Sequence, residues 1–202
     1  MIDTRPVRAG LVATTLLLAG CAGAKPAGEP AGPSAPARFA TPAALGDVPR
    51  AGDPHWTENR EAQLKVLRPL VADPTADYAE AYMETDPAKI SFSKGTPVIH
   101  VRAVAGTVAD PHGTVERLIA AMPFPAMSDV RPLDDAPGGV AVRCGAATEN
   151  LSDSHRSDPR ETLTVCFWAD SGSVGLYMHR VPGGADRRAD FLAHYASVRP
   201  AG

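Results

Sequence analysis

The chain has 202 residues, with 20 Lys or Arg against 23 Asp or Glu, and a formal net charge of −3. Because Asp3, Arg5 and Arg8 lie in the first twenty residues, the remainder carries 22 acids against 18 bases. Nucleic-acid-binding domains normally show a basic patch or stripe, so this balance argues against that class of function.

The first twenty residues have the layout of an export signal. Arg5 and Arg8 form a short positive region, and the run from Leu11 to Leu18 is almost wholly apolar. This run is about half of the roughly 20 residues that a transmembrane helix needs. The pattern therefore predicts a signal peptide over residues 1–20 rather than a permanent membrane span.

Two processing sites compete at the end of this leader. Leu18-Ala19-Gly20-Cys21 resembles the lipobox of bacterial prolipoproteins. The resemblance implies that Cys21 receives a diacylglycerol with acyl chains such as palmitate, and that the chain is cleaved just before it. Several acyl chains hold a protein firmly, so we expect lipid anchoring at the outer face of the cell membrane. Ala22-Gly23-Ala24 fits ordinary signal peptidase instead, which would give soluble secretion.

Residues 21–54 are rich in Pro, Ala and Gly and contain few large apolar side chains. Neither a period of 2 nor one of 3.6 is visible in them, so they cannot bury enough surface to offset the chain entropy. We expect this segment to be a disordered tether. It would connect the lipidated N-terminus to a single folded domain over residues 55–200.

The first half of that domain predicts helices and one strand. Apolar residues at helical spacing predict a helix from Thr57 to just before Pro69, and a weaker helical pattern covers Thr75–Met83. The β-branched run Pro97–Val104 predicts a strand. A further helix starts after Asp110, which is a candidate N-cap, with Pro111 at the favoured first position.

The second half predicts three strands and a last helix. The strands cover Gly138–Cys144, Thr162–Asp170 and Ser173–His179, with a tight hairpin turn between the last two, and the helix covers Asp186–Val198. We therefore predict an α+β fold, a small antiparallel sheet with helices packed on one face. Alternation places Leu163, Val165 and Phe167 on one face of their strand and Thr164, Cys166 and Trp168 on the other.

With Cys21 lipidated, Cys144 and Cys166 remain as an even pair in an oxidising compartment. They lie in two predicted strands that can be neighbours in the sheet, which favours one disulfide between them. A redox or metal-binding pair is the alternative. No Cys-x-x-Cys spacing and no adjacent His support that reading.

The stretches "GTVADPHGTVERLIAAM", "GGVAVRCG", "VCFWADSGSVG" and "SVRP" together resemble an exported or membrane-anchored actinobacterial family with a C-x-W-A-D motif. The resemblance covers Val104–Arg199, and its most specific part runs from Cys166 to Asp170, with Gly175 beyond. It implies the same architecture and location. The family has no established activity, so the resemblance implies no catalytic residue.

Candidate catalytic residues are few. "ADSGS" at Ala169–Ser173 is similar to the nucleophile turn of chymotrypsin-like proteases, but so short a domain lacks room for their two barrels, so Ser171 is expected to be a turn residue. His100 and His179 are the histidines that a sheet could bring together. None of the six histidines has metal-binding spacing: His55, His100, His112, His155, His179 and His194.

We therefore predict a non-enzymatic binding or structural domain, held at the membrane by its lipid, with an unknown protein or small envelope ligand as its partner and no nucleic acid. No catalytic residue, metal ion or cofactor is predicted. Trp168 is expected to pack over the disulfide rather than to bind a ligand. Exposed Trp and Tyr are nevertheless common binding anchors, so Trp168, Tyr177 and His179 are alternative candidates for a site on an open sheet face. An envelope hydrolase with an unrecognised His/Asp site is the alternative.

Overall fold

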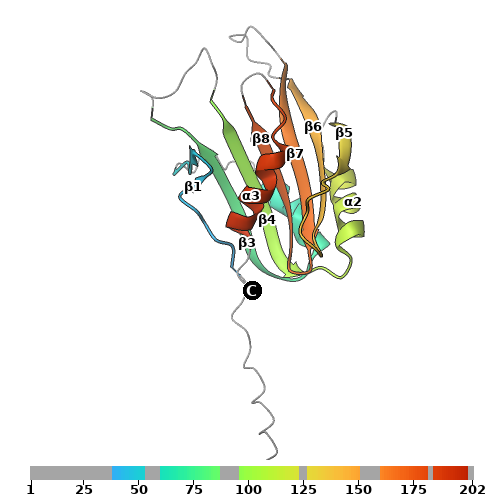
Figure 1. Cartoon of the computed structure of the whole chain (residues 1–202). Helices are drawn as coiled ribbons and strands as arrows, with labels where there is room; N and C mark the ends of the chain where they lie inside the picture. Colours follow the sequence, from blue (N-terminus) through green and yellow to red (C-terminus); the bar gives the residue numbers. More distant parts are fainter. Residues whose placement is uncertain are drawn as a thin grey trace, which may run out of the picture. The chain divides into compact units, whose positions relative to one another are not determined.

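The computed structural model describes residues 38–52, 60–86, 96–122, 127–150, 160–181 and 184–199. The predicted signal peptide, Cys21 and most of the predicted tether lie outside these ranges. The main element is a six-stranded antiparallel sheet in the order β3-β4-β8-β7-β6-β5 (Figure 1). Its strands are β3 (Ala72–Met83), β4 (Val98–Thr107), β5 (Met127–Pro132), β6 (Ala141–Asn150), β7 (Arg160–Asp170) and β8 (Ser173–Arg180).

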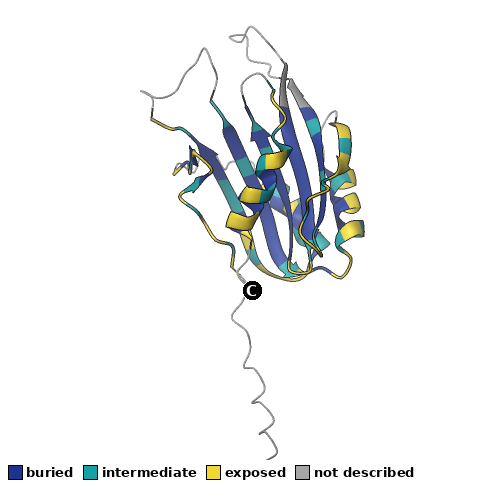
Figure 2. Ribbon diagram, in the orientation of Figure 1, coloured by how far each residue is buried: buried dark blue, intermediate teal, exposed yellow. Residues whose placement is uncertain are grey.

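Helices cover both faces of this sheet, so the prediction of helices on one face was wrong. On one face, α1 (Arg60–Leu67) packs against β4, and α2 (Pro111–Ala121) packs against β7, whose Val165 and Phe167 belong to the apolar cluster on this face. On the other face, α3 (Arg188–Val198) packs against Trp168 and lies in front of the sheet in Figure 1. The physical reason is visible in β7, because both of its alternating residue sets are largely apolar and both must be buried. Figure 2 shows the central strands buried between the exposed outer faces of the helices.

Several local predictions are confirmed. α2 begins with Pro111, and the Asp110 side chain accepts a hydrogen bond from Gly113 N at 3.0 Å, which caps the helix. α1 ends at Leu67 and continues as a short 3-10 turn, Arg68–Leu70. The hairpin between β7 and β8 turns at residues 171–172 as expected. None of the helices in the described ranges is both long and apolar enough to cross a bilayer.

The prediction of a helix at Thr75–Met83 was wrong, because this stretch belongs to β3. Residues 76–83 pair without a break with Val98–Ala105 of β4. Alanine and glutamate favour helices, but such preferences amount to less than about 1 kcal/mol per residue, and eight consecutive inter-strand partners outweigh them. Asp73, with φ of 51°, and a register shift between Ala72 and Ala76 mark an irregular start to the strand.

The expected tether also ends sooner than predicted. Residues 38–52, named the arm below, contain the short strands β1 (Ala44–Leu45) and β2 (Val48–Pro49), which pair as a hairpin. The arm joins the outer edge of β3 where Arg50 bridges Tyr82 and Ala51 N donates to Ala81 O at 2.9 Å. Because the arm buries apolar side chains against the sheet, it is part of the fold: Leu45, Val48 and Ala51.

The predicted disulfide is confirmed. Cys144 of β6 and Cys166 of β7 are direct cross-strand partners, and their sulfur atoms are bonded. Both residues are fully buried on the face that α3 covers. The bond therefore links the two strands under the last helix.

Candidate functional site

The residues of the C-x-W-A-D stretch hold the last hairpin and the last helix together. The Asp170 carboxylate accepts hydrogen bonds from Gly172 N at 2.7 Å and Ser173 Oγ at 2.9 Å, which fix the turn. Tyr195 of α3 donates its hydroxyl to the same carboxylate at 2.6 Å. Ser171 is an exposed turn residue. This aspartate therefore has a structural task in the hairpin turn.

Trp168 lies across Gly175, its direct partner on β8. A Cβ atom added to Gly175 would come within 2.1 Å of the Trp168 indole, so only glycine leaves room for the ring. The ring is 1% exposed and contacts Phe191 and Tyr195 of α3, with ring centroids 5.8 and 5.9 Å away. Trp168 is consequently an internal packing residue beneath α3, close to the disulfide.

The three residues proposed as anchors on an open sheet face are all covered. Tyr177 is 1% exposed and His179 is 4% exposed, and both lie on the face under α3. They do form a cluster, however, with a residue that the sequence analysis did not group with them: His194 of α3, 7% exposed. No sequence pattern links Tyr177 and His179 of β8 with His194, which comes fifteen positions after His179. Only the packing of α3 on the sheet reveals the cluster.

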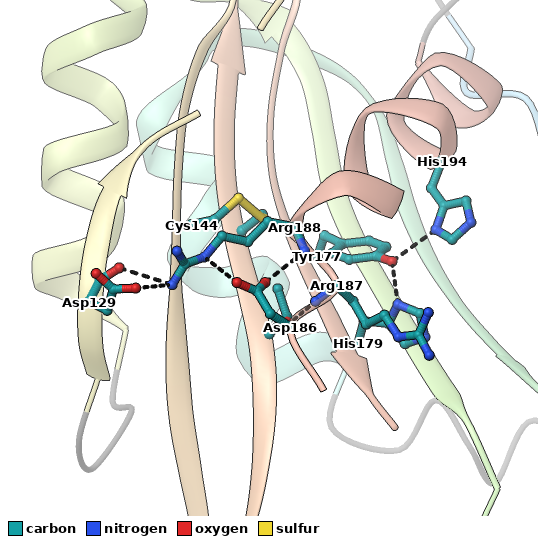
Figure 3. Close-up of a disulfide and its surroundings, with 10 residues drawn as sticks. Asp129, Cys144, Tyr177, His179, Asp186, Arg187, Arg188 and His194 are labelled. Carbon is teal, nitrogen blue, oxygen red and sulfur yellow. Dashed lines mark hydrogen bonds and ion pairs between the residues drawn. A yellow bond between two sulfur atoms is a disulfide. The ribbon is translucent and has the colours of Figure 1, made fainter. Parts of the chain in front are cut away.

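In this cluster, one hydroxyl lies between two imidazoles (Figure 3). The Tyr177 hydroxyl is 2.9 Å from His179 Nδ1 and 2.8 Å from His194 Nδ1. A hydroxyl has one proton, so with both rings neutral it donates to one Nδ1 and accepts from the other ring's Nδ1–H. The two histidines are therefore held in opposite tautomers. His179 Nε2 is buried and has no hydrogen-bond partner within the described part of the chain.

Burial decides the charge of this cluster. It lowers the pKa of His179 from 6.5 to about 4, against the opposing effect of Asp190, whose carboxylate lies 3.8 Å from His179 Nδ1. Burial lowers the pKa of His194 as well, and raises that of the Tyr177 hydroxyl above its usual range. At neutral pH the hydroxyl and both rings are therefore uncharged.

The buried position of the two imidazoles makes this cluster poorly suited to catalysis. A general base must come within hydrogen-bond reach of a substrate proton, and both imidazoles are covered by protein. No serine or cysteine hydroxyl or thiol is among the groups that the cluster's hydrogen bonds connect. Within the described ranges, no three His, Cys, Asp or Glu side chains gather in a way that could hold a metal ion.

His100 does not join this cluster, so the idea that His100 and His179 meet across the sheet was wrong. His179 pairs with Ile99, which places His100 on the opposite face. There His100 Nδ1 is 3.3 Å from Nη2 of Arg102, a buried arginine whose Nη1 donates to Glu80 O at 2.7 Å. Burial, together with the Arg102 charge, lowers the pKa of His100 to about 4.

An open groove lies on the outer side of β3, between this strand and the arm. It has a volume of about 350 Å³ and is lined by Arg38, Phe39 and Thr41 of the arm and by Thr75–Glu80 of β3. The Phe39 and Tyr78 rings are 5.4 Å apart, which ties the arm to the strand at one point of the groove. The arm runs beside β3 in Figure 1.

The main chain of β3 contributes to this groove. Ala81 O points outward, because it accepts from Ala51 N of the arm. Peptide orientation repeats every second residue, and the register from Ala76 to Met83 is unbroken, so the peptide groups of Asp77 and Ala79 also point outward. No strand in the described ranges pairs with them on that side. The groove is thus bordered by main-chain donors and acceptors.

Comparison with protein-family models, curated proteins and solved structures finds no match for this chain. The assignment of function therefore depends on the geometry of the groove and of the buried cluster.

Proposed function

We propose that this protein is an exported, lipid-anchored domain that binds an extended segment of another polypeptide along the outer edge of β3. The observation that carries the proposal is the groove, where the outward peptide groups of Asp77 and Ala79 pair with no strand of the described residues. An extended chain added to an exposed sheet edge gains main-chain hydrogen bonds, and pockets beside the edge select its side chains. Export and lipidation at Cys21 are the part of the proposal that depends on the lipobox.

The groove fits this kind of partner in size and chemistry. The six residues Thr75–Glu80 span about 20 Å as a strand, enough to pair with a short peptide. Asp77 is held by Arg68, whose Nη2 lies 2.6 Å from its carboxylate, so this side chain is fixed beside the edge. The half-buried ring of Phe39, which packs against Tyr78, offers a surface for one apolar side chain of the partner.

The other edge of the sheet is built differently. β5 carries a register shift between Ser128 and Arg131, and Asp129 has φ of 53°. Arg188 of α3 holds the Asp129 carboxylate at 2.6 Å. Bulges and charges of this kind are features that discourage strand addition. β3 has a similar irregularity, but only at its start, and Ala76–Met83 beyond it pair without a break, whereas the shift in β5 divides a strand of six residues. The longer regular stretch favours β3 as the binding edge.

The test is a selection of heptapeptides from a random displayed library against the domain, with two matched arm variants. Thr41→Trp places an indole in the groove, whereas Ala43→Trp places the same indole on an exposed arm residue that does not line it. Selected peptides should bind the parent and Ala43→Trp alike and lose at least tenfold in affinity for Thr41→Trp. They should also slow amide hydrogen exchange at Asp77 and Ala79. Equal binding to both variants, or protection at β5 instead, would contradict the proposal.

The hydrolase alternative makes a different prediction. An active site at Tyr177, His179 and His194 would give turnover of an ester, peptide or glycoside that His194→Asn abolishes. Because both imidazoles are covered, we expect no turnover above that of the variant. A measurable rate that depends on His194 would replace the binding proposal with an enzymatic one.

A further inference from the structure

We propose that the Tyr177–His179–His194 cluster is an acid-sensitive seal that keeps the β1–β2 hairpin of the arm closed over α3. The seal goes beyond binding, because it would regulate whether the arm stays in place. Its link to the groove rests on the proposed function, whereas the opening of the hairpin can be measured without any ligand.

The hairpin lies directly against the cluster. A Cβ atom added to Gly46 would be 3.3 Å from His194 Nε2, so the turn of the hairpin covers this ring. Gly46 has φ of +61°, a conformation that glycine adopts at no steric cost. Leu45 and Val48, on either side of the turn, are buried in the same apolar cluster as Tyr177. Seating of the hairpin therefore depends on the state of His194.

A proton added to the ring whose Nδ1 accepts from Tyr177 conflicts with the hydrogen bonds of the cluster, whereas on the other ring it would enter at Nε2 and add only a buried charge. In the neutral state the Tyr177 hydroxyl donates to one Nδ1 and accepts from the other. When the accepting ring is protonated, both Nδ1 atoms become donors, and the hydroxyl proton loses its acceptor. Protonation thus places a charge in a buried site and leaves one polar hydrogen there unpaired. Both effects favour a state in which the rings reach water.

Charged groups face the cluster from two sides. Asp190 of α3 and Arg187, the residue just before α3, partly offset each other, with Arg187 Nη1 3.6 Å from the Asp190 carboxylate. Asp47 lies on the turn of the hairpin. Both carboxylates favour the protonated rings, yet burial outweighs them and the pKa of each histidine is lowered. The described residues that β3 and β4 contribute to this apolar cluster are Tyr78, Tyr82, Ile99, Val101 and Ala103, and the two tyrosine hydroxyls are hydrogen-bonded at 2.6 Å.

The hairpin is the weaker of the two elements that close the seal. Each of its strands has two residues. α3 has eleven residues, buries Phe191 and Tyr195 among others, and is tied to Asp170. Elements with few buried contacts open first. Since the hairpin continues into Phe39 and Thr41, its opening would displace the wall of the groove.

The test is amide hydrogen exchange of the hairpin at pH 7 and pH 5, corrected for the intrinsic exchange rate. The reporters are Arg50 N, bonded to Ala43 O, and Ala51 N, bonded to Ala81 O. For His179 alone, a pKa of 6.5 in the open state and about 4 in the closed state gives an increase in the opening constant of roughly 20-fold between these pH values. His194 should add to this factor.

His179→Asn and His194→Asn keep an amide near the Nδ1 position but cannot be protonated, so each should flatten the pH dependence. His112→Asn is the matched control, because His112 is exposed on α2, and it should keep the full increase. If a variant does not fold, the measurement on the unmodified protein still decides. Equal opening constants of the hairpin at both pH values would overturn the seal. The seal would also be overturned if the hairpin amides exchanged at the same rate as the amides of β7 and β8, because the hairpin would then open only together with the sheet. Failure of peptide binding alone would contradict the proposed function but would not overturn the seal.

Discussion

Gly175→Ala tests how the tryptophan is seated under α3. The added Cβ would lie 2.1 Å from Trp168 Cζ2 and 2.2 Å from Cη2, whereas carbon atoms in contact are about 3.5–4.0 Å apart. The ring must therefore shift by more than an ångström. It is buried and contacts Phe191 and Tyr195, so its movement would displace α3.

The expected loss of unfolding free energy is about 2–4 kcal/mol. Overpacking a core costs about 1–3 kcal/mol, and displacing a buried aromatic ring can add to this. The sign of the change in unfolding free energy is informative, because alanine in place of glycine normally stabilises a strand by about 0.5–1 kcal/mol, whereas here we expect a loss. Gly138→Ala is the matched control, since nothing lies within 4 Å of its Cβ position. We expect its effect to stay within about 0.5 kcal/mol of the parent.

Urea denaturation followed by far-UV circular dichroism measures both variants, and near-UV dichroism reports the packing of the tryptophan. Combining Gly175→Ala with Trp168→Leu should recover part of the loss, because the smaller side chain leaves room for the methyl group. If Gly175→Ala is as stable as the parent, Trp168 does not lie on Gly175, and the structural explanation of this motif fails.

The remaining predictions concern the anchor, the disulfide, the tie to α3 and the second buried histidine. Cys21→Ala should move the protein from the membrane to the soluble fraction with an unchanged melting temperature, and retention in the membrane would contradict lipidation. Cys144→Ser should lose roughly 3 kcal/mol in oxidising buffer for a separation of 22 residues, while membrane attachment persists; an unchanged denaturation midpoint would contradict a stabilising bond. Tyr195→Phe should lose roughly 1.5–3 kcal/mol, because a hydrogen bond to the charged Asp170 disappears, and a stability within error of the parent would show that this bond is not needed. For His100, the folded pKa of about 4 is below the unfolded 6.5, so stability should fall by at most about 3 kcal/mol as pH drops between these values; urea midpoints in His100→Gln that decline as in the parent would exclude this residue as the cause.

Local chemistry determined the parts of the fold that depend on near neighbours. The start of α2 needs only the Asp110 cap and the fixed φ of Pro111, and it was predicted correctly. The turn from Asp170 to Ser173 needs only a short loop, and it was also predicted correctly. The disulfide followed from two strand predictions and from the even number of cysteines that remain when Cys21 is set aside as the predicted lipidation site. These inferences use information that lies within a few residues or in a residue count.

Tertiary contacts determined the rest. β3 has a composition typical of helices, and it is a strand because β4 supplies a continuous ladder of partners. The central strand β7 is apolar on both sides, which requires a second cover, but periodicity does not show that α3 provides it. The arm is rich in Ala and Pro and gives no periodic signal of its order. Tyr177 and His179 meet His194 only because α3 folds back over β8. Sequence periodicity indicates which side chains must be buried, but the element that buries them is selected by long-range packing.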